Sequence, residues 1–163
     1  MGAKGDILAA IEGATALLVS CVTFRTETGT ESAEAAEAFV YWPGEKPWTE
    51  VPGPKRAVER VWPDFFAWVR FGEGTGLSVP GCIPNTPLEI WIQKSTAEGA
   101  SPREEARTFL KVVGLLMREM GQNSYGEGML ALNRITLNEL GKNDDAEGRE
   151  YMEARLGLEA GAA

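Results

Sequence analysis

The stretch from Ser101 to Gly121 constrains the fold more than any other part of this sequence. Ser101 suits the N-cap of a helix, Pro102 suits its first position, and Glu104 follows three residues after the cap. Gly121 is a typical C-terminal cap, and the interior Gly114 predicts a close approach of another backbone. Apolar residues recur at helical spacing, which predicts a helix of about 28 Å with one buried face. These are Ala106, Phe109, Leu110, Val113, Leu116, Met117 and Met120.

Two strand-like segments follow the helix, Met129–Leu140 and Arg149–Glu159, and the polar stretch 141–148 between them predicts a turn. Residue types alternate in the second segment with period two, which predicts one buried face and one solvated face. Met152, Ala154, Leu156 and Leu158 point one way, and Tyr151, Glu153, Arg155 and Glu159 point the other. We therefore predict a C-terminal β-hairpin packed against the long helix.

Three strands are predicted in the middle of the chain, at Phe39–Trp42, Phe65–Phe71 and Thr86–Lys94. We expect Trp68 and Trp91, which belong to the last two, to pack within the sheet. The fold class that follows is α+β: a single domain over residues 1–163, with a mixed or antiparallel sheet packed against one long helix. Residues 160–163 are expected to form a disordered tail.

The N-terminal region predicts a short amphipathic helix that Asp6 caps. Ile7, Leu8, Ile11 and Leu18 would share its apolar face. The β-branched run Val19–Thr26 predicts a strand, and Thr28–Ala38 is either a helical turn or a loop. Leu18-Val19-Ser20-Cys21 resembles a lipoprotein cleavage site, but Asp6 and Glu12 interrupt the apolar region that a signal sequence needs. No segment reaches the length of a membrane span.

Residues 43–64 are rich in proline, glycine and tryptophan, and they predict a long loop. Long loops without secondary structure are often functional, and aromatic side chains are common in protein interfaces. Trp48 and Trp62 are therefore candidate interface residues, although folding back onto the domain would also account for them.

Composition gives few groups for catalysis. The chain has 24 acidic and 16 basic side chains, a net charge of −8, two cysteines and no histidine. Histidine, the commonest general base in enzymes, is therefore missing. Two cysteines without histidine also do not complete a usual zinc site. We expect both cysteines to be reduced and mostly buried. Gly72, Gly74 and Gly76 lack the following helix that a phosphate loop needs, and Asn143-Asp144-Asp145 lacks the calcium-loop pattern. We therefore expect no catalytic residue, cofactor or metal.

The order of predicted elements resembles the tail terminator family of long-tailed bacteriophages, also called minor tail protein U or tail completion proteins. That order is an N-terminal helix, several strands with a long aromatic loop, a long helix and a terminal β-hairpin. The resemblance spans roughly Asp6 to Glu159 and departs from the family at Glu31–Ala38. It is clearest in Trp62–Arg70, Ile135–Asn138 and Gly148–Leu156.

The resemblance implies a structural virion protein, assembled in the host cytoplasm, that forms a ring, usually a hexamer, on the head-proximal end of the tail tube. Such a ring ends tube polymerisation and presents a surface to the head–tail connector, without a reaction or a cofactor. Its partners would be itself, the tube protein, the connector and passing DNA. The alternatives are another neck or tube component, or a small-molecule-binding protein or enzyme that uses a pair of carboxylates.

An acidic ring lumen would let duplex DNA pass without holding it, because carboxylates repel the phosphate backbone. Two clusters supply the required charge, and we hypothesise that one of them faces the lumen, with the turn cluster preferred. The alternative is that both only solvate the outer surface. The clusters are Glu31, Glu34 and Glu37, and Asp144, Asp145 and Glu147.

Overall fold

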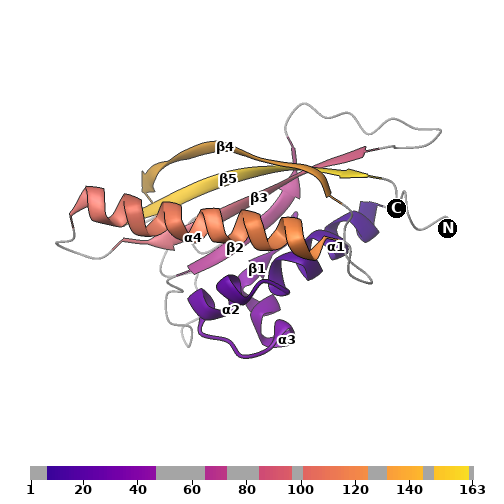
Figure 1. Cartoon of the computed structure of the whole chain (residues 1–163), viewed down its shortest axis with the longest axis horizontal. Helices are drawn as coiled ribbons and strands as arrows, with labels where there is room; N and C mark the ends of the chain where they lie inside the picture. The colour runs from indigo at the N-terminus through magenta and orange to yellow at the C-terminus, as the bar shows by residue number, and fades with distance from the viewer. Residues whose placement is uncertain are drawn as a thin grey trace.

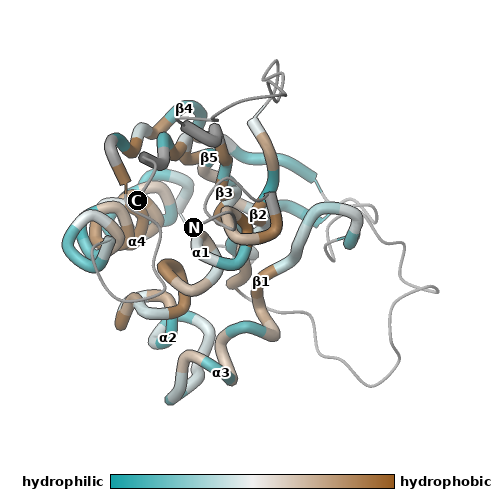
Figure 2. Tube along the Cα trace, turned by 90° about the vertical axis from the view of Figure 1, so that its right-hand side faces the viewer, coloured by the Kyte–Doolittle hydropathy of each residue, from teal (hydrophilic) through white to brown (hydrophobic). Residues whose placement is uncertain are grey.

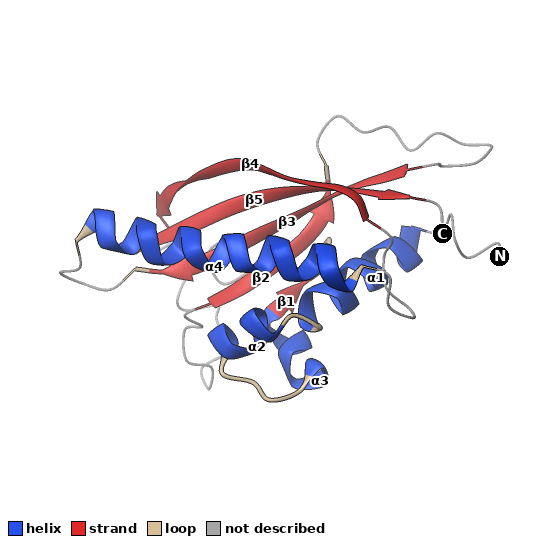
Figure 3. Cartoon of the chain, viewed as in Figure 1, coloured by secondary structure: helices blue, strands red, loops and turns tan. Residues whose placement is uncertain are grey.

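The computed structural model describes residues 7–46, 65–72, 85–96, 101–124, 132–144 and 149–161. It confirms the α+β class, with several helices and a five-stranded sheet in one domain (Figures 1 and 3). The elements are α1 (Ile7–Val19), α2 (Val22–Thr28), α3 (Ala33–Ala36), the 3-10 helix η2 (Glu37–Phe39), β1 (Val40–Tyr41), β2 (Phe65–Phe71), β3 (Asn85–Ser95), α4 (Pro102–Asn123), β4 (Leu132–Asp144) and β5 (Glu150–Gly161).

The strands lie in the order β1-β2-β3-β5-β4. β1 is parallel to β2, and the other neighbours are antiparallel. β5 lies between β3 and β4 although it comes last, because the chain crosses over through α4 and places β4 at the edge. The sheet is therefore mixed, and it ends in the predicted hairpin.

The helices lie together on one side of the strands, so the domain has two layers (Figure 2). α1 packs against β2 and β3, and α4 packs against β4 and β5. The core lies between the layers, where alternate strand residues meet the apolar helix faces. Its most completely buried large side chains include Phe24, Phe65, Phe109, Leu17, Leu18, Leu88, Ile90, Ile92, Leu116, Met120 and Leu156.

The long helix is confirmed, and Ser101 is its N-cap as predicted, although the Ser101 side chain makes no cap hydrogen bond. Three details of the prediction were wrong. Helix α4 passes through Gly121 and ends at Asn123. Leu110 is exposed, because the buried stripe runs through Val112 instead. Gly114 is also exposed, and a Cβ there would meet nothing within 4 Å, so no backbone in the described part of the chain approaches it.

The strand predicted at Val19–Thr26 is wrong. Val19 ends α1, and α2 begins at Val22 after a short break. Helix α2 buries Phe24 edge-on against Phe65 of β2, with ring centroids 5.7 Å apart. Gly29 caps it in the left-handed conformation with φ of 70°. Packing of the Phe24 ring therefore outweighs the β propensity of the neighbouring residues.

The region 28–38, for which the sequence allows a helical turn or a loop, contains the short α3. Ser32 caps α3, with its hydroxyl accepting a hydrogen bond from the Ala35 amide at 3.1 Å. In α1, Ile11 and Leu18 are buried as predicted, whereas Leu8 is 51% exposed and does not belong to the apolar face. Asp6, the predicted cap of α1, lies outside the described residues.

The hairpin is longer than predicted. The stretch 141–144, predicted as turn, belongs to β4, because Gly141 pairs with Glu153 and Asp144 pairs with Glu150. At the other end, the predicted disorder from residue 160 is wrong for Ala160 and Gly161. Both residues continue β5, and their partners in β3 are Thr86 and Asn85. Residues 162 and 163 lie outside the described part.

Candidate assembly surfaces

The face of the sheet turned away from the helices carries a stack of aromatic rings and guanidinium groups. Trp68 and Trp91 meet edge to face across β2 and β3, with ring centroids 5.1 Å apart, which confirms that both pack in the sheet. The Arg70 guanidinium lies 4.5 Å from the Trp68 ring and 4.2 Å from the Trp91 ring. Arg155 of β5 lies 3.7 Å from the Trp91 ring. Cation–π attraction therefore joins three strands on this face.

Glu153 is the centre of a polar network beside this stack. The sequence predicted a solvated face here, and that prediction is wrong at Glu153, which is only 4% exposed, and at Tyr151. The amide of Gln93 donates to Glu153 at 2.6 Å, and Asn143 and Arg155 donate to its other oxygen at 3.0 and 3.1 Å. The carboxylate is buried because donors from three strands replace its water.

Several polar atoms on the same face have no hydrogen-bond partner although they are buried. They are Nε1 of Trp68, Nε1 of Trp91, Nε of Arg70 and Oε1 of Glu89. Arg70 and Glu89 are opposite residues of β2 and β3. Unpaired buried groups of this kind are costly, and the two others among the described residues, Oε2 of Glu105 and Oε2 of Glu119, lie on α4.

The candidate lumen residues fall in two places. Glu31, Glu34 and Glu37 are exposed on and beside α3, on the helical side of the molecule. Asp144 is exposed at the end of β4. Its partners in the turn cluster, Asp145 and Glu147, lie outside the described residues, as do the candidate interface residues Trp48 and Trp62.

The outward face of α4 carries a basic stripe, a feature that the sequence reasoning missed. The stripe consists of Arg103, Arg107, Lys111 and Arg118, all exposed. Positions i, i+4, i+8 and i+15 lie on one side of a helix, and here that side is opposite the buried Val112 and Leu116. The sequence signal for this stripe is the four-residue spacing of Arg103, Arg107 and Lys111. The prediction of α4 relied only on the spacing of its apolar residues.

The acidic residues of α4 do not offset this stripe. Only Glu104 is exposed, and it pairs with Arg107 at 3.3 Å. Glu105 and Glu119 are half-buried. Glu105 pairs with Lys142 of β4 at 3.7 Å, and Glu119 accepts a hydrogen bond from the Thr23 amide at 3.1 Å. The outward face of α4 is therefore basic on a chain with a net charge of −8.

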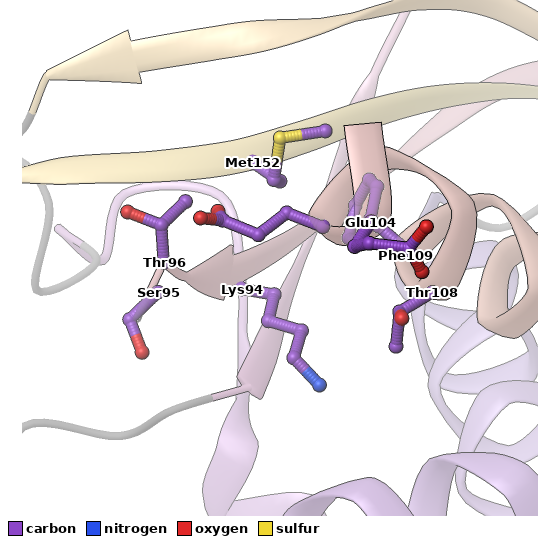
Figure 4. A pocket seen from close by; sticks show the side chains of 8 residues that line it. Lys94, Ser95, Thr96, Glu104, Thr108, Phe109 and Met152 are labelled. Carbon is purple, nitrogen blue, oxygen red and sulfur yellow. The ribbon is translucent and has the colours of Figure 1, made fainter. Parts of the chain in front are cut away.

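A pocket of about 260 Å³ lies where the first turns of α4 meet the ends of β3 and β5 (Figure 4). It has an apolar part, made by Phe109 and Met152, and a polar rim that includes Lys94. The lining residues are Lys94, Ser95, Thr96, Glu104, Glu105, Thr108, Phe109 and Met152.

The two carboxylates of the pocket do not form an acid–base pair. Glu104 and Glu105 are neighbours in one helix, so their side chains leave it in different directions. Each also has its own cation, Arg107 for Glu104 and Lys142 for Glu105. Catalysis by two carboxylates needs both groups to converge on one substrate atom, and this geometry does not bring them together.

Cys21 is buried and free. Burial, reinforced by the nearby Glu119 carboxylate, raises the pKa of the Cys21 thiol to about 12, so the thiol is a poor nucleophile near neutral pH. Cys82 lies outside the described residues. Within the described ranges, no group of three or more acidic or cysteine side chains is placed to hold a metal ion.

Among the described residues, no single helix is long and apolar enough to cross a membrane. Leu8–Val19 and Val22–Thr28 together meet the length and composition criteria, but they are bent by 76°. In comparisons with known proteins, no protein-family model matches the chain, and no curated protein matches it.

Proposed function

We propose that this chain is a structural virion protein that caps the head-proximal end of a phage tail tube, ends its polymerisation and offers a surface to the connector. The order of elements supports this proposal. An N-terminal helical region, three strands, the long α4 and the β4–β5 hairpin follow one another as in the tail terminator family that the sequence resembles. The proposal includes self-association into a ring, in the tail of the virion.

The observation that carries the assembly role is the edge of the sheet at β4. This strand is 13 residues long, and it has no neighbour on its outer side among the described strands. Leu137 and Leu140 on it are 40% and 37% exposed. An edge with free backbone groups and exposed leucines is suited to contact with another chain.

The β4 edge is also shaped to limit its partners. Its pairing with β5 shifts register between Leu132 and Arg134 and again between Leu137 and Glu139. Such irregularities bend an edge strand and prevent indiscriminate pairing with flat strands. We assign this edge to the contact with the tail tube, where a bent, partly apolar surface meets one complementary partner.

The test is to mix the purified protein with tail tubes of the same phage and to examine them by negative-stain microscopy. We expect rings at one end of each tube and no further growth of capped tubes. Leu137→Glu combined with Leu140→Glu should abolish capping. Val22→Glu is the control, since Val22 is an exposed apolar residue on α2, away from the edge. Long tubes formed by this protein alone would instead identify a tube subunit.

The acidic lumen remains part of the proposal, with the end of the hairpin as the candidate. Asp144 is exposed at the end of β4, where it can project from the sheet. Changing Asp144, Asp145 and Glu147 to Lys should slow DNA ejection from assembled particles, most strongly at low salt, since phosphates would then be held. Unchanged ejection from normally assembled particles would exclude this turn from the lumen.

A further inference from the structure

We propose that the basic face of α4 in one subunit binds the acidic α3 region of a second copy of this chain. The basic face is Arg103, Arg107, Lys111 and Arg118, and the acidic region is Glu31, Glu34 and Glu37. The inference rests on the self-association in the proposed function and names the surfaces that carry it. It gives the α3 carboxylates a role at the subunit contact, which is an alternative to a place in the lumen.

Most of these charges have no ion-pair partner within the described part of one subunit, and the exception is Arg107, which pairs with the exposed Glu104 at 3.3 Å. Arg103, Lys111 and Arg118 make no ion pair there, and neither do the three carboxylates of the α3 region. Other cations do pair with acids, as Lys94 does with Glu27 at 3.0 Å. Each of the two surfaces thus carries charges of one sign, opposite to those of the other, which favours contact between copies over pairing within one copy.

The spacing of the charges also matches between the two surfaces. Arg107 and Lys111 are one helical turn apart, which separates their Cβ atoms by about 6 Å. Glu34 and Glu37 are also about one turn apart, on α3 and η2. Two carboxylates can therefore face two cations in one docking arrangement, and Glu31 is left for a cation farther along α4.

The shape of the α4 surface also favours close contact with a second copy. Leu110 and Leu115 are 43% and 41% exposed, and Gly114 lies between them with open space where a Cβ would be. The facing region offers small residues, the exposed Ala35 and Ala38. Small side chains let two backbones come close, and the leucines add apolar contact area to the charge pairing.

The two surfaces are different parts of the chain, so their contact is head to tail. Such a contact repeats from one copy to the next and forms a ring when the rotation closes. α4 and α3 occupy different parts of the helical layer (Figure 1). Nucleic acid is the other ligand that a basic stripe could bind, but the net charge of −8 disfavours a phosphate polymer.

The experiment uses charge reversal on the full chain. One variant carries Arg107→Glu, Lys111→Glu and Arg118→Glu, and the other carries Glu31→Lys, Glu34→Lys and Glu37→Lys. We expect each variant alone to lose the ring and to sediment as a monomer. An equimolar mixture should recover rings, because every contact in an alternating ring is again between opposite charges. A chain with all six changes should form rings alone, and that recovery would also show that the reversed surfaces fold.

The matched control is Lys46→Glu against Arg107→Glu, since Lys46 is an exposed cation outside both surfaces. Only Arg107→Glu should weaken assembly, and raised salt should weaken assembly of the wild type. If the wild type assembles and both triple variants assemble equally well, the inference is overturned and the ring proposal stands. If the wild type forms no ring alone or on tubes, both are overturned. If reversal on α4 removes only binding to duplex DNA, the stripe is a nucleic-acid surface and the inference is overturned.

Discussion

The face of the sheet that meets the helices and the face turned away from them are built from alternate residues of the same strands. On the helix side, Leu156 of β5 packs among apolar neighbours such as Ile90 and Leu116. On the other side, the next residues along β5 are held by hydrogen bonds and cation–π contacts, as Glu153 and Arg155 are. Both faces are buried near the centre, but by different interactions, so a low exposed fraction does not by itself identify an apolar core.

This difference affects tolerance to change. The stability of an apolar face depends mainly on the total volume of its side chains, so the face can repack around substitutions. A buried polar network depends on each donor and acceptor, because removal of one member leaves the others unpaired. The outer face should therefore be more sensitive to the chemical type of each residue than the helix-facing side. The helix-facing side should contribute more of the free energy of folding.

The largest expected effect is on the helix side. Leu156 is completely buried, so Leu156→Ala removes apolar contact and leaves a cavity. We expect the free energy of unfolding to fall by about 2–5 kcal/mol in urea denaturation. A loss below about 1 kcal/mol would mean that the layers collapse easily onto the vacated space and that this face is loosely packed.

The next effect is on the outer side, where Glu153→Ala should cost about 1–3 kcal/mol. The change leaves Gln93 and Asn143 without their acceptor in a buried site. The solvated face that the sequence predicts here would instead imply a cost within about 0.5 kcal/mol, as for an exposed residue. Urea denaturation distinguishes the two values, and a negligible loss would show that water reaches this network.

A smaller quantity, the coupling between Gln93 and Glu153, tests whether the outer face acts as a network. In a double-mutant cycle with Gln93→Ala and Glu153→Ala, we expect a coupling of about 0.5–1.5 kcal/mol, since their side chains are joined by a hydrogen bond of 2.6 Å. Additive losses would mean that the two residues are buried independently of each other.

The sequence was sufficient to predict those helices and strands whose local residue pattern agrees with their packing in the fold. The helix of α4 was predicted because its buried face repeats at the helical period, and the strand at Phe65–Phe71 was predicted from its aromatic and β-branched residues. The α2 region was mispredicted, because the packing of Phe24 against Phe65 comes from a distant part of the chain. The exposure of Gly114 was also not predictable, because glycine occurs both where two backbones are in close contact and on open surfaces.

The site was less predictable than the fold. Period two in β5 gave the correct direction of each side chain, but it did not give the burial of Glu153, because the necessary donor is 60 residues away at Gln93. Of the candidate site residues, the α3 carboxylates and Asp144 are exposed, which is compatible with either role assigned to them. The basic stripe on α4 needed no long-range information, since its spacing was present in the sequence.

The smallest expected effect is at Glu159. Comparing Glu159 with Glu153 separates the effect of burial from the effect of residue type on the outer face. Glu159 and Glu153 are the same residue type on the same face of β5, but Glu159 is exposed and lies opposite Arg134 at the edge. Because water already solvates this carboxylate, Glu159→Ala should change the free energy of unfolding by no more than about 0.5 kcal/mol. If Glu153→Ala and Glu159→Ala lowered the free energy of unfolding by the same amount in urea denaturation, position in the strand rather than the hydrogen-bond network would set the cost. The distinction between a polar buried centre and a solvated margin would then have to be abandoned for this face.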